Sequence, residues 1–192
     1  ETWLTFARSH SPDAAFGGLS LKQAPNDKRF AVHRSMASKS DCVPAQLRQL
    51  QPEKHLFTSN LLIRNDIYKA YPFDKGFSGW GWEDVEWGMR VSNAHHIHHP
   101  DIPATHTGLD TVADLKRKYV QSADNFARLA HLHPGFVAQY PSYKVARMIG
   151  RLHMGSVVEI VADFTSRLER LPVPFRALSL RFYRAALYAK AL

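Results

Sequence analysis

The chain has 192 residues, of which 45% are hydrophobic and 22% charged, proportions typical of a soluble globular protein large enough for a sizeable core. Its single cysteine, Cys42, excludes an intrachain disulfide framework and a cysteine-only zinc site, and it fits a reducing compartment. No uninterrupted run of about 20 apolar residues occurs, so the sequence predicts no membrane span.

The net charge of +8 is unevenly distributed along the chain. Residues 143–192 contain nine Lys/Arg and three Asp/Glu, a net of +6. Such a basic segment indicates a negatively charged partner, either nucleic acid or an anionic membrane surface, or simply a soluble surface. The chain starts at Glu1 and shows no secretory signal, so we expect a fragment or a chain whose natural start was removed.

The pattern of residues 1–68 predicts short helices and short strands. In chain order we expect the end of a helix over residues 1–8, a buried strand over 14–21, a loop over 22–41, a short helix over 44–50, and a strand over 56–64. Asn65 or Asp66 then caps a one-turn helix through Tyr68. The basic residues of the expected loop, including His33, either face a phosphate or are simply solvated.

The remainder predicts mainly helices. A glycine-rich loop over 70–82 precedes a helix over 83–93, and short extended pieces follow at 95–99 and 104–107. Thr111 and Asp114 form a capping box for a long helix that ends at Pro134. Its expected apolar face comprises Val112, Leu115, Tyr119, Phe126 and Leu129. From Ser142 the pattern is helical, with one break at 172–174 before a last helix over 175–192.

The most distinctive stretch is the segment from Phe77 to Arg90. Gly79 and Gly81 permit backbone conformations and close approaches that a Cβ would block. Trp80 and Trp82 offer flat apolar surfaces, each with one N–H donor, which suit a sugar ring. Glu83 and Asp84 follow at an expected helix start, where the helix dipole favours the ionised carboxylate. The ordinary alternative is an acidic helix start after a tight turn, with both tryptophans in the core.

Several ordered motifs give this stretch a family context. They are Thr58-Ser59-Asn60-Leu61-Leu62-Ile63-Arg64, Tyr71-Pro72-Phe73-Asp74, Gly79-Trp80-Gly81-Trp82-Glu83-Asp84, and His98-His99-Pro100-Asp101-Ile102-Pro103-Ala104-Thr105-His106-Thr107-Gly108. Together they resemble the acceptor side of inverting glycosyltransferases of the GT-A fold, particularly family 2 and the related galactosyltransferase C-terminal region. The resemblance covers the chain from about Ala14 to about Pro134. It implies an α/β, GT-A-like C-terminal half with a short mixed sheet over residues 1–135. The helical pattern and positive charge that follow indicate an all-α, basic C-terminal extension over 136–192.

The resemblance also implies roles for individual residues. Asp84 takes the position of the catalytic base, and Glu83 the neighbouring position that binds acceptor hydroxyls. Trp80, Gly81 and Trp82 would form the walls around the acceptor sugar, although many relatives have Gly where this chain has Trp82. The implied reaction transfers a sugar, with inversion, from a nucleotide-sugar donor to a carbohydrate or lipid-linked acceptor.

The resemblance also implies a metal site and a further residue that contacts the acceptor. His106 matches a histidine that completes a divalent-metal site, Mn²⁺ or Mg²⁺, beside the leaving diphosphate. Asn60 could bond the acceptor or loop backbone, and a structural role is an equal alternative. Of the histidines between His95 and His99, only His96 and His98 can face together in an extended segment. Because the chain contains no Asp-x-Asp metal motif, we expect it alone to bind metal and donor poorly and to be inactive.

Two other functions are open. A non-catalytic carbohydrate-binding remnant would use the same tryptophans without the paired carboxylates. A nucleic-acid-binding protein agrees with the pI of 9.7, but the aromatic residues cluster with carboxylates rather than with Lys/Arg, so we expect no nucleic-acid partner.

The last expected helix, residues 175–192, indicates where the protein acts. Its wheel places on one face Phe175, Leu178, Phe182, Ala185, Ala189 and Leu192. With arginines off that face, the pattern predicts a helix lying on an anionic membrane surface, and hence a cytoplasmic protein that is peripheral on the inner face of the membrane. The alternative packs Leu180 and Leu187 into the domain, so that the helix covers its core.

Overall fold

The computed structural model describes residues 2–192, which form two compact units. Unit 1 comprises the residues up to 25 together with 37–75 and 83–108, and unit 2 comprises 26–36, 76–82 and 109–192. The chain is mixed α/β, with small sheets and a helical C-terminal region. The expected division into residues 1–135 and 136–192 stays a prediction.

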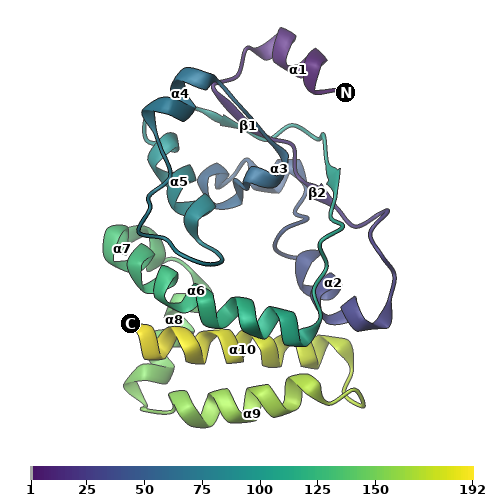
Figure 1. Cartoon of the computed structure of the whole chain (residues 1–192), viewed down its shortest axis with the longest axis vertical. Coiled ribbons are helices and arrows are strands. Elements are labelled where there is room, and N and C mark those ends of the chain that lie inside the picture. Colours follow the sequence, from purple (N-terminus) through teal and green to yellow (C-terminus); the bar gives the residue numbers. More distant parts are fainter. Residues whose placement is uncertain (1) are drawn as a thin grey trace. The chain divides into compact units, whose positions relative to one another are not determined.

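Unit 1 is built on two small sheets (Figure 1). The central strand β1 (Ala14–Phe16) is completely buried, as the sequence predicts, and pairs antiparallel with β3 (Leu61–Ile63) and parallel with β4 (Ile97–His98). A second, parallel pair joins β2 (Leu19–Ser20) to β5 (Ala104–Thr105). The single strand expected over 14–21 is therefore two strands, interrupted at Gly17 and Gly18, where Gly18 has a φ of 91°.

The helices of unit 1 are short except for the one that follows the glycine-rich loop. They are α1 (Trp3–His10), α3 (Ala45–Arg48), α4 (Asn65–Ala70) and α5 (Glu83–Ser92), with 3₁₀ turns η2 (Pro52–His55) and η3 (Thr58–Asn60). The core of the unit comprises Ala14, Leu56, Ile67, Trp87, Val91 and Ile97. In α5 the side chains of Val85 and Met89 are buried one turn apart, as their spacing predicts.

Two expectations for unit 1 are wrong in detail. The segment 56–64 is not a continuous strand, because Thr58–Asn60 forms η3 and only Leu61–Ile63 pairs. The N-cap of α4 is Arg64, without a side-chain capping bond, rather than Asn65 or Asp66. Arg64 instead forms ion pairs with Asp13 and Asp66.

The expected loop over 22–41 contains helical structure, so that prediction is wrong. It includes η1 (Lys28–Phe30) and α2 (Ala31–Ala37). Val32 and Met36, one helical turn apart, are buried in the core of unit 2. Burial of these two side chains stabilises the helix. The surrounding polar residues are the reason why the sequence predicted a loop here.

Unit 2 is a helical bundle. Its helices are α6 (Val112–Leu132), α7 (Pro134–Val137), α8 (Pro141–Arg151), α9 (Gly155–Arg167) and α10 (Val173–Ala191), with most of α2. The predicted capping box of Thr111 and Asp114 begins α6, and both of its reciprocal bonds are present. Helix α10 lies between α6 and α9 (Figure 1) and buries Leu180 completely.

The helical pattern predicted from Ser142 onward is broken once more than expected. Residues 152–154 separate α8 from α9, and His153 has a φ of 52°. On α9 the side chains of Val157, Ile160 and Phe164 are 57%, 70% and 64% exposed. Across residues 2–192, no helix is both long enough and apolar enough to cross a bilayer.

Candidate functional site

The glycine-rich loop of unit 2 is held by one side chain of α6. The amide nitrogen of Asn125 donates to the carbonyl oxygens of Ser78 and Gly81, each at 2.9 Å, and its oxygen accepts from the Ser78 N–H at 3.1 Å. Gly79 and Gly81 adopt φ values of 74° and 95°, which glycine reaches without a steric cost. The loop is therefore a defined turn that presents its tryptophans from fixed backbone positions.

Trp82 is a structural anchor of unit 2. Its indole N–H donates to the Tyr188 hydroxyl at 2.9 Å, and its ring packs against Phe126, Tyr140 and Tyr188. Its φ of 78° costs a non-glycine residue about 1–2 kcal/mol, which these contacts offset. For Trp82, the contacts agree with the core interpretation of the motif.

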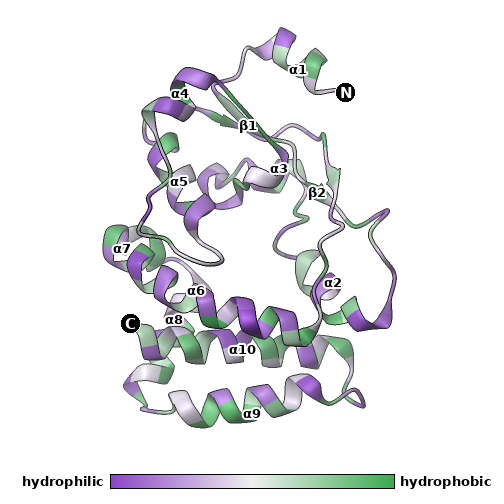
Figure 2. Cartoon of the chain, viewed as in Figure 1, coloured by the Kyte–Doolittle hydropathy of each residue, from purple (hydrophilic) through white to green (hydrophobic). Residues whose placement is uncertain are grey.

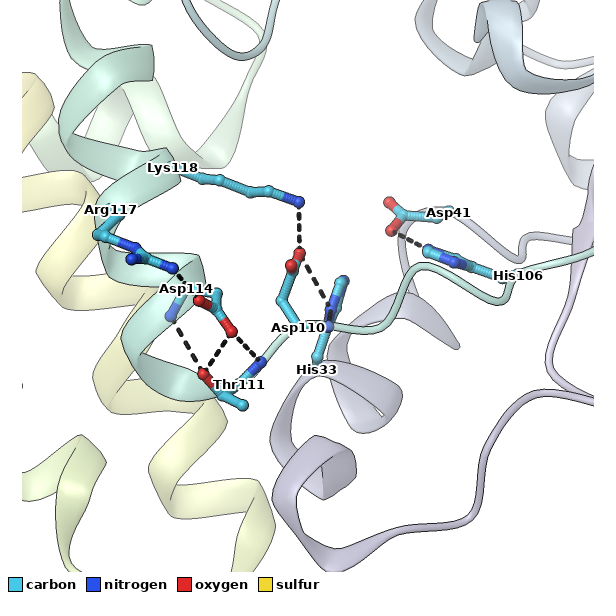
Figure 3. A network of polar contacts seen from close by, with 8 residues as sticks. All are labelled: His33, Asp41, His106, Asp110, Thr111, Asp114, Arg117 and Lys118. Carbon is cyan, nitrogen blue, oxygen red and sulfur yellow. Dashed lines mark hydrogen bonds and ion pairs between the residues drawn. The ribbon is translucent and has the colours of Figure 1, made fainter.

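Trp80 is more accessible, with 40% of its surface exposed. The Lys118 ammonium lies 5.5 Å from the centre of its ring and also donates to the Asp110 carboxylate at 2.6 Å. Asp110 in turn lies beside the buried His33, whose Nδ1 accepts from the Asp110 backbone N–H at 2.7 Å (Figure 3). Unit 2 thus places the exposed ring of Trp80 next to Lys118, and Lys118 is joined through Asp110 to the imidazole of His33.

Sequence reasoning did not select Lys118 or Asp110, and it treated His33 as a loop residue. No spacing in the sequence signals this group, because His33 comes from α2 while Asp110 and Lys118 flank the start of α6. Only the capping box at Thr111 could have helped to predict this group. It locates the start of α6, and therefore places Asp110 just before that helix.

Asp84 lies in the first turn of α5 in unit 1. Its Oδ2 accepts from the backbone N–H of Thr58 at 3.3 Å and from the Thr58 hydroxyl at 3.4 Å. Burial raises the pKa of the Asp84 carboxyl above its ordinary value, and the two bonds from Thr58 offset part of that rise. The expectation that the helix start favours the ionised form is therefore corrected, because desolvation outweighs it. A carboxyl with a raised pKa is suited to accept a proton.

Glu83 is the first residue of α5 and is half-buried. The same turn contains Glu86, which is 2% exposed and accepts a 2.7 Å hydrogen bond from Arg90. This buried ion pair was not predicted, although its i,i+4 spacing on an expected helix was visible in the sequence.

The predicted site residues belong to both units. Trp80, Gly81 and Trp82 lie in unit 2, whereas Glu83, Asp84, Asn60 and His106 lie in unit 1. The boundary between the units falls at the peptide bond from Trp82 to Glu83. Within unit 1, Glu83 and Asp84 share one helical turn, as predicted.

Asn60 has an architectural role in unit 1. Its amide nitrogen donates to the carbonyl oxygens of Gly18 and Ile102, both at 2.8 Å, and its oxygen accepts from the Trp3 indole at 3.1 Å. A Cβ on Gly17 would approach this amide to 2.6 Å. Both carbonyl groups lie outside the glycine-rich loop, so these contacts give Asn60 the structural role that was one of its alternatives. A bond to an acceptor stays a prediction.

His106 follows β5, and its Nε2 lies 3.5 Å from Oδ2 of Asp41 in the same unit (Figure 3). One imidazole nitrogen and one carboxylate oxygen are donor types that Mn²⁺ accepts. Asp41 was not selected from the sequence, because it lies in the segment expected to be a loop. Unit 1 thus places one imidazole nitrogen and one carboxylate oxygen close together, and the metal role of His106 stays a prediction.

The histidines between His95 and His99 divide as predicted. His96 and His98 face together, with ring centres 4.4 Å apart. His95 instead pairs with Asp13 at 3.0 Å, and the buried His99 contacts Arg48 at 3.2 Å. Alternation along β4 therefore separates these side chains.

No family model, curated protein or solved structure matches the chain. The resemblance to glycosyltransferases thus depends on the ordered motifs of the sequence alone.

A pH dependence of stability follows from two histidines in unit 1. Burial lowers the pKa of both His55 and His99 to about 4, against an ordinary value of 6.5. Between pH 6.5 and pH 4 these histidines bind protons in the unfolded chain but stay neutral in the folded chain. The free energy of unfolding therefore falls as the pH drops toward 4. We expect a loss of the order of 2 kcal/mol from His99 over that interval.

Chemical denaturation between pH 7 and pH 4.5 measures this effect. His99→Gln should flatten the dependence. His96→Gln, at an exposed position of the same segment, should change it much less, because the charge of His96 is the smallest of the causes that lower the pKa of His99. A stability that stays constant over this range in the wild-type chain would contradict the assignment.

Proposed function

We propose that the chain is the acceptor side of an inverting glycosyltransferase with a GT-A-like fold. The observation that carries the proposal is the position of Asp84 in the first turn of α5, where the Thr58 N–H and hydroxyl hold its carboxylate. Desolvation, which raises the pKa of this half-buried carboxyl, supports the role of a base. The ordered motifs around it provide the family context. The mixed α/β unit that contains Asp84 agrees with this fold class at the coarse level.

In the proposed reaction Asp84 accepts the proton from the attacking hydroxyl of the acceptor. The hydroxyl oxygen forms a bond to the anomeric carbon while the bond from that carbon to the diphosphate breaks, and the diphosphate leaves with the electron pair. Protonated Asp84 then loses its proton to solvent. Glu83 would accept a hydrogen bond from an acceptor hydroxyl, as the resemblance implies.

A divalent ion would neutralise charge on the leaving diphosphate. His106 and Asp41 have the donor types to hold such an ion, with other ligands coming from the diphosphate and water. The nucleotide-sugar donor and a carbohydrate or lipid-linked acceptor are the proposed partners.

A carbohydrate-binding module without catalysis is the second candidate, and one observation favours it. Trp80 exposes its ring in unit 2 beside charged groups that can bond sugar hydroxyls. This candidate requires Trp80 but not Asp84, so substitutions at these two positions separate the two functions.

Trp80→Ala is expected to weaken glycan binding about tenfold, because a sugar ring stacked on the indole loses that contact. An oligosaccharide array identifies a ligand for the 192-residue chain, and saturation-transfer NMR then compares the variants. Tyr68→Ala, which removes another exposed aromatic ring in unit 1, is the matched control. Absence of glycan binding, or equal binding by the Trp80 variant, would contradict both carbohydrate functions.

A further inference from the structure

Helices α9 and α10 of unit 2 contain many hydrophobic residues (Figure 2). An unusual number of these apolar side chains are exposed. This α9–α10 apolar surface comprises Met154, Val157, Ile160, Val161, Phe164, Phe175, Leu178 and Phe182, each at least 40% exposed. Val157 and Val161 of α9 face Phe175, Leu178 and Phe182 of α10 across a groove of about 520 Å³. Contiguous exposed apolar area of this kind marks an interaction surface rather than ordinary scatter.

A second groove, of about 480 Å³, lies along α8 and is basic. Lys144, Arg147 and Arg151 line it together with Tyr143, Met148 and Leu152, and its lining residues include no acid. Only residues 152–154 separate α8 from α9. Leu152 lines the basic groove and Met154 the apolar one, so the two grooves adjoin at this corner of unit 2.

The acidic residues of α9 do not balance this charge. Glu159 pairs with Lys190, and Asp163 pairs with Lys116 and Arg167. Their charges are therefore compensated inside unit 2. Arg181, which is exposed and adjacent to Phe182 on α10, adds a further positive charge at the edge of the apolar surface.

We propose that the α9–α10 apolar surface and the basic groove of α8 together dock unit 2 on an anionic membrane surface. The apolar side chains enter the boundary between headgroups and acyl chains, while Lys144, Arg147 and Arg151 contact lipid phosphates. A second copy of the chain fits less well, because a two-fold interface would bring two sets of like charges together. The inference does not depend on the proposed transferase activity.

The surface differs from the one that the sequence predicts over residues 175–192. Ala185 of that expected face is only 3% exposed and belongs to the interior of unit 2. Helix α9 takes its place, since Val157, Val161 and Phe164 project outward. The docking surface is thus a pair of packed helices rather than one helix lying alone in the interface.

Flotation with lipid vesicles tests the proposal on the 192-residue chain. We expect binding to phosphatidylcholine vesicles that contain phosphatidylserine, weaker binding at high salt, and little binding to phosphatidylcholine alone. Phe175→Ser with Phe182→Ser, and separately Arg147→Glu with Arg151→Glu, should each lower binding to the anionic vesicles by at least about tenfold.

The controls change the same properties elsewhere. Leu50→Ser removes an exposed leucine of unit 1, and Lys69→Glu reverses an exposed charge there; both should bind as the wild type does. Circular dichroism and thermal melting verify that every variant is folded. Equal binding to neutral and anionic vesicles, or undiminished binding by both double variants, would overturn the proposal. A dimer in light scattering that Phe175→Ser disrupts would instead assign the surface to a second copy.

Discussion

Asp84→Asn is expected to lower the turnover of sugar transfer by about 10²-fold or more, because the amide cannot take the proton from the attacking hydroxyl. The measurement is the rate of sugar transfer by the chain together with the partner or domain that supplies the donor-binding Asp-x-Asp site, because the chain alone is expected to be inactive. The glycan affinity of the same variant should stay unchanged, since Asn has nearly the same shape. Asp101→Asn, at an exposed carboxylate of unit 1, is the control and should retain full turnover.

Although Asp84→Asn should lower turnover, it should not lower the stability of the fold. The folded-state pKa of Asp84 is raised, so its contribution to stability is present at low pH and is lost as the pH rises and this carboxyl ionises. At pH 7 the ionised carboxylate therefore costs stability, and Asp84→Asn should be as stable as the wild type or more stable. Loss of turnover together with unfolding would show damage to the fold rather than loss of a base.

A shift in the pH profile separates a base from a structural carboxylate. The Thr58 hydroxyl lowers the pKa of Asp84 through a hydrogen bond. Thr58→Val removes that bond, so the pH below which turnover falls should move upward. Near-normal turnover in Asp84→Asn, or a pH profile that Thr58→Val does not move, would remove Asp84 from the proposed role.

Leu180→Ala is expected to destabilise unit 2 by about 2–5 kcal/mol, because it empties a fully buried position in the core. Leu178→Ala, two residues earlier on the same helix, removes a side chain that is 47% exposed. Its cost should stay below about 1 kcal/mol. Urea denaturation followed by circular dichroism compares the two variants, which differ only in which face of α10 they alter.

The two leucines also link stability to docking. We expect Leu178→Ala to weaken vesicle binding with little loss of stability. Leu180→Ala should lower stability but leave vesicle binding unchanged as long as the variant remains folded. Similar unfolding free energies for the two variants would indicate that α10 does not pack on α6 and α9 as described.

Local patterns predicted several parts of the fold. The apolar run at Ala14 became a buried strand, and Val85 and Met89 became the buried side of α5. Thr111 and Asp114 located the start of α6 to the residue, because a capping box is formed within one turn of chain. These features depend on neighbours three or four residues apart, and for that reason they are visible in the sequence.

The same patterns misled where distant contacts decide the outcome. Val32 and Met36 looked like part of a polar loop, yet the core of unit 2 stabilises them as a helix. For Asn60 the sequence left an acceptor contact and a structural role open, and only the structure shows that Trp3, Gly18 and Ile102 bond its amide. In both cases the partners lie far away in sequence.

The candidate site divides in the same way. By itself, the sequence determined the order of motifs, the pair Glu83 and Asp84 at a helix start, and the basic character of residues 143–192. Only the tertiary structure decided that Trp82 is an anchor while Trp80 stays accessible, and that burial raises the pKa of Asp84. It also decided that the exposed apolar face belongs to α9 as much as to α10. The physical reason is that exposure and desolvation depend on everything packed around a side chain, whereas periodicity reports only which residues share one face of their own helix.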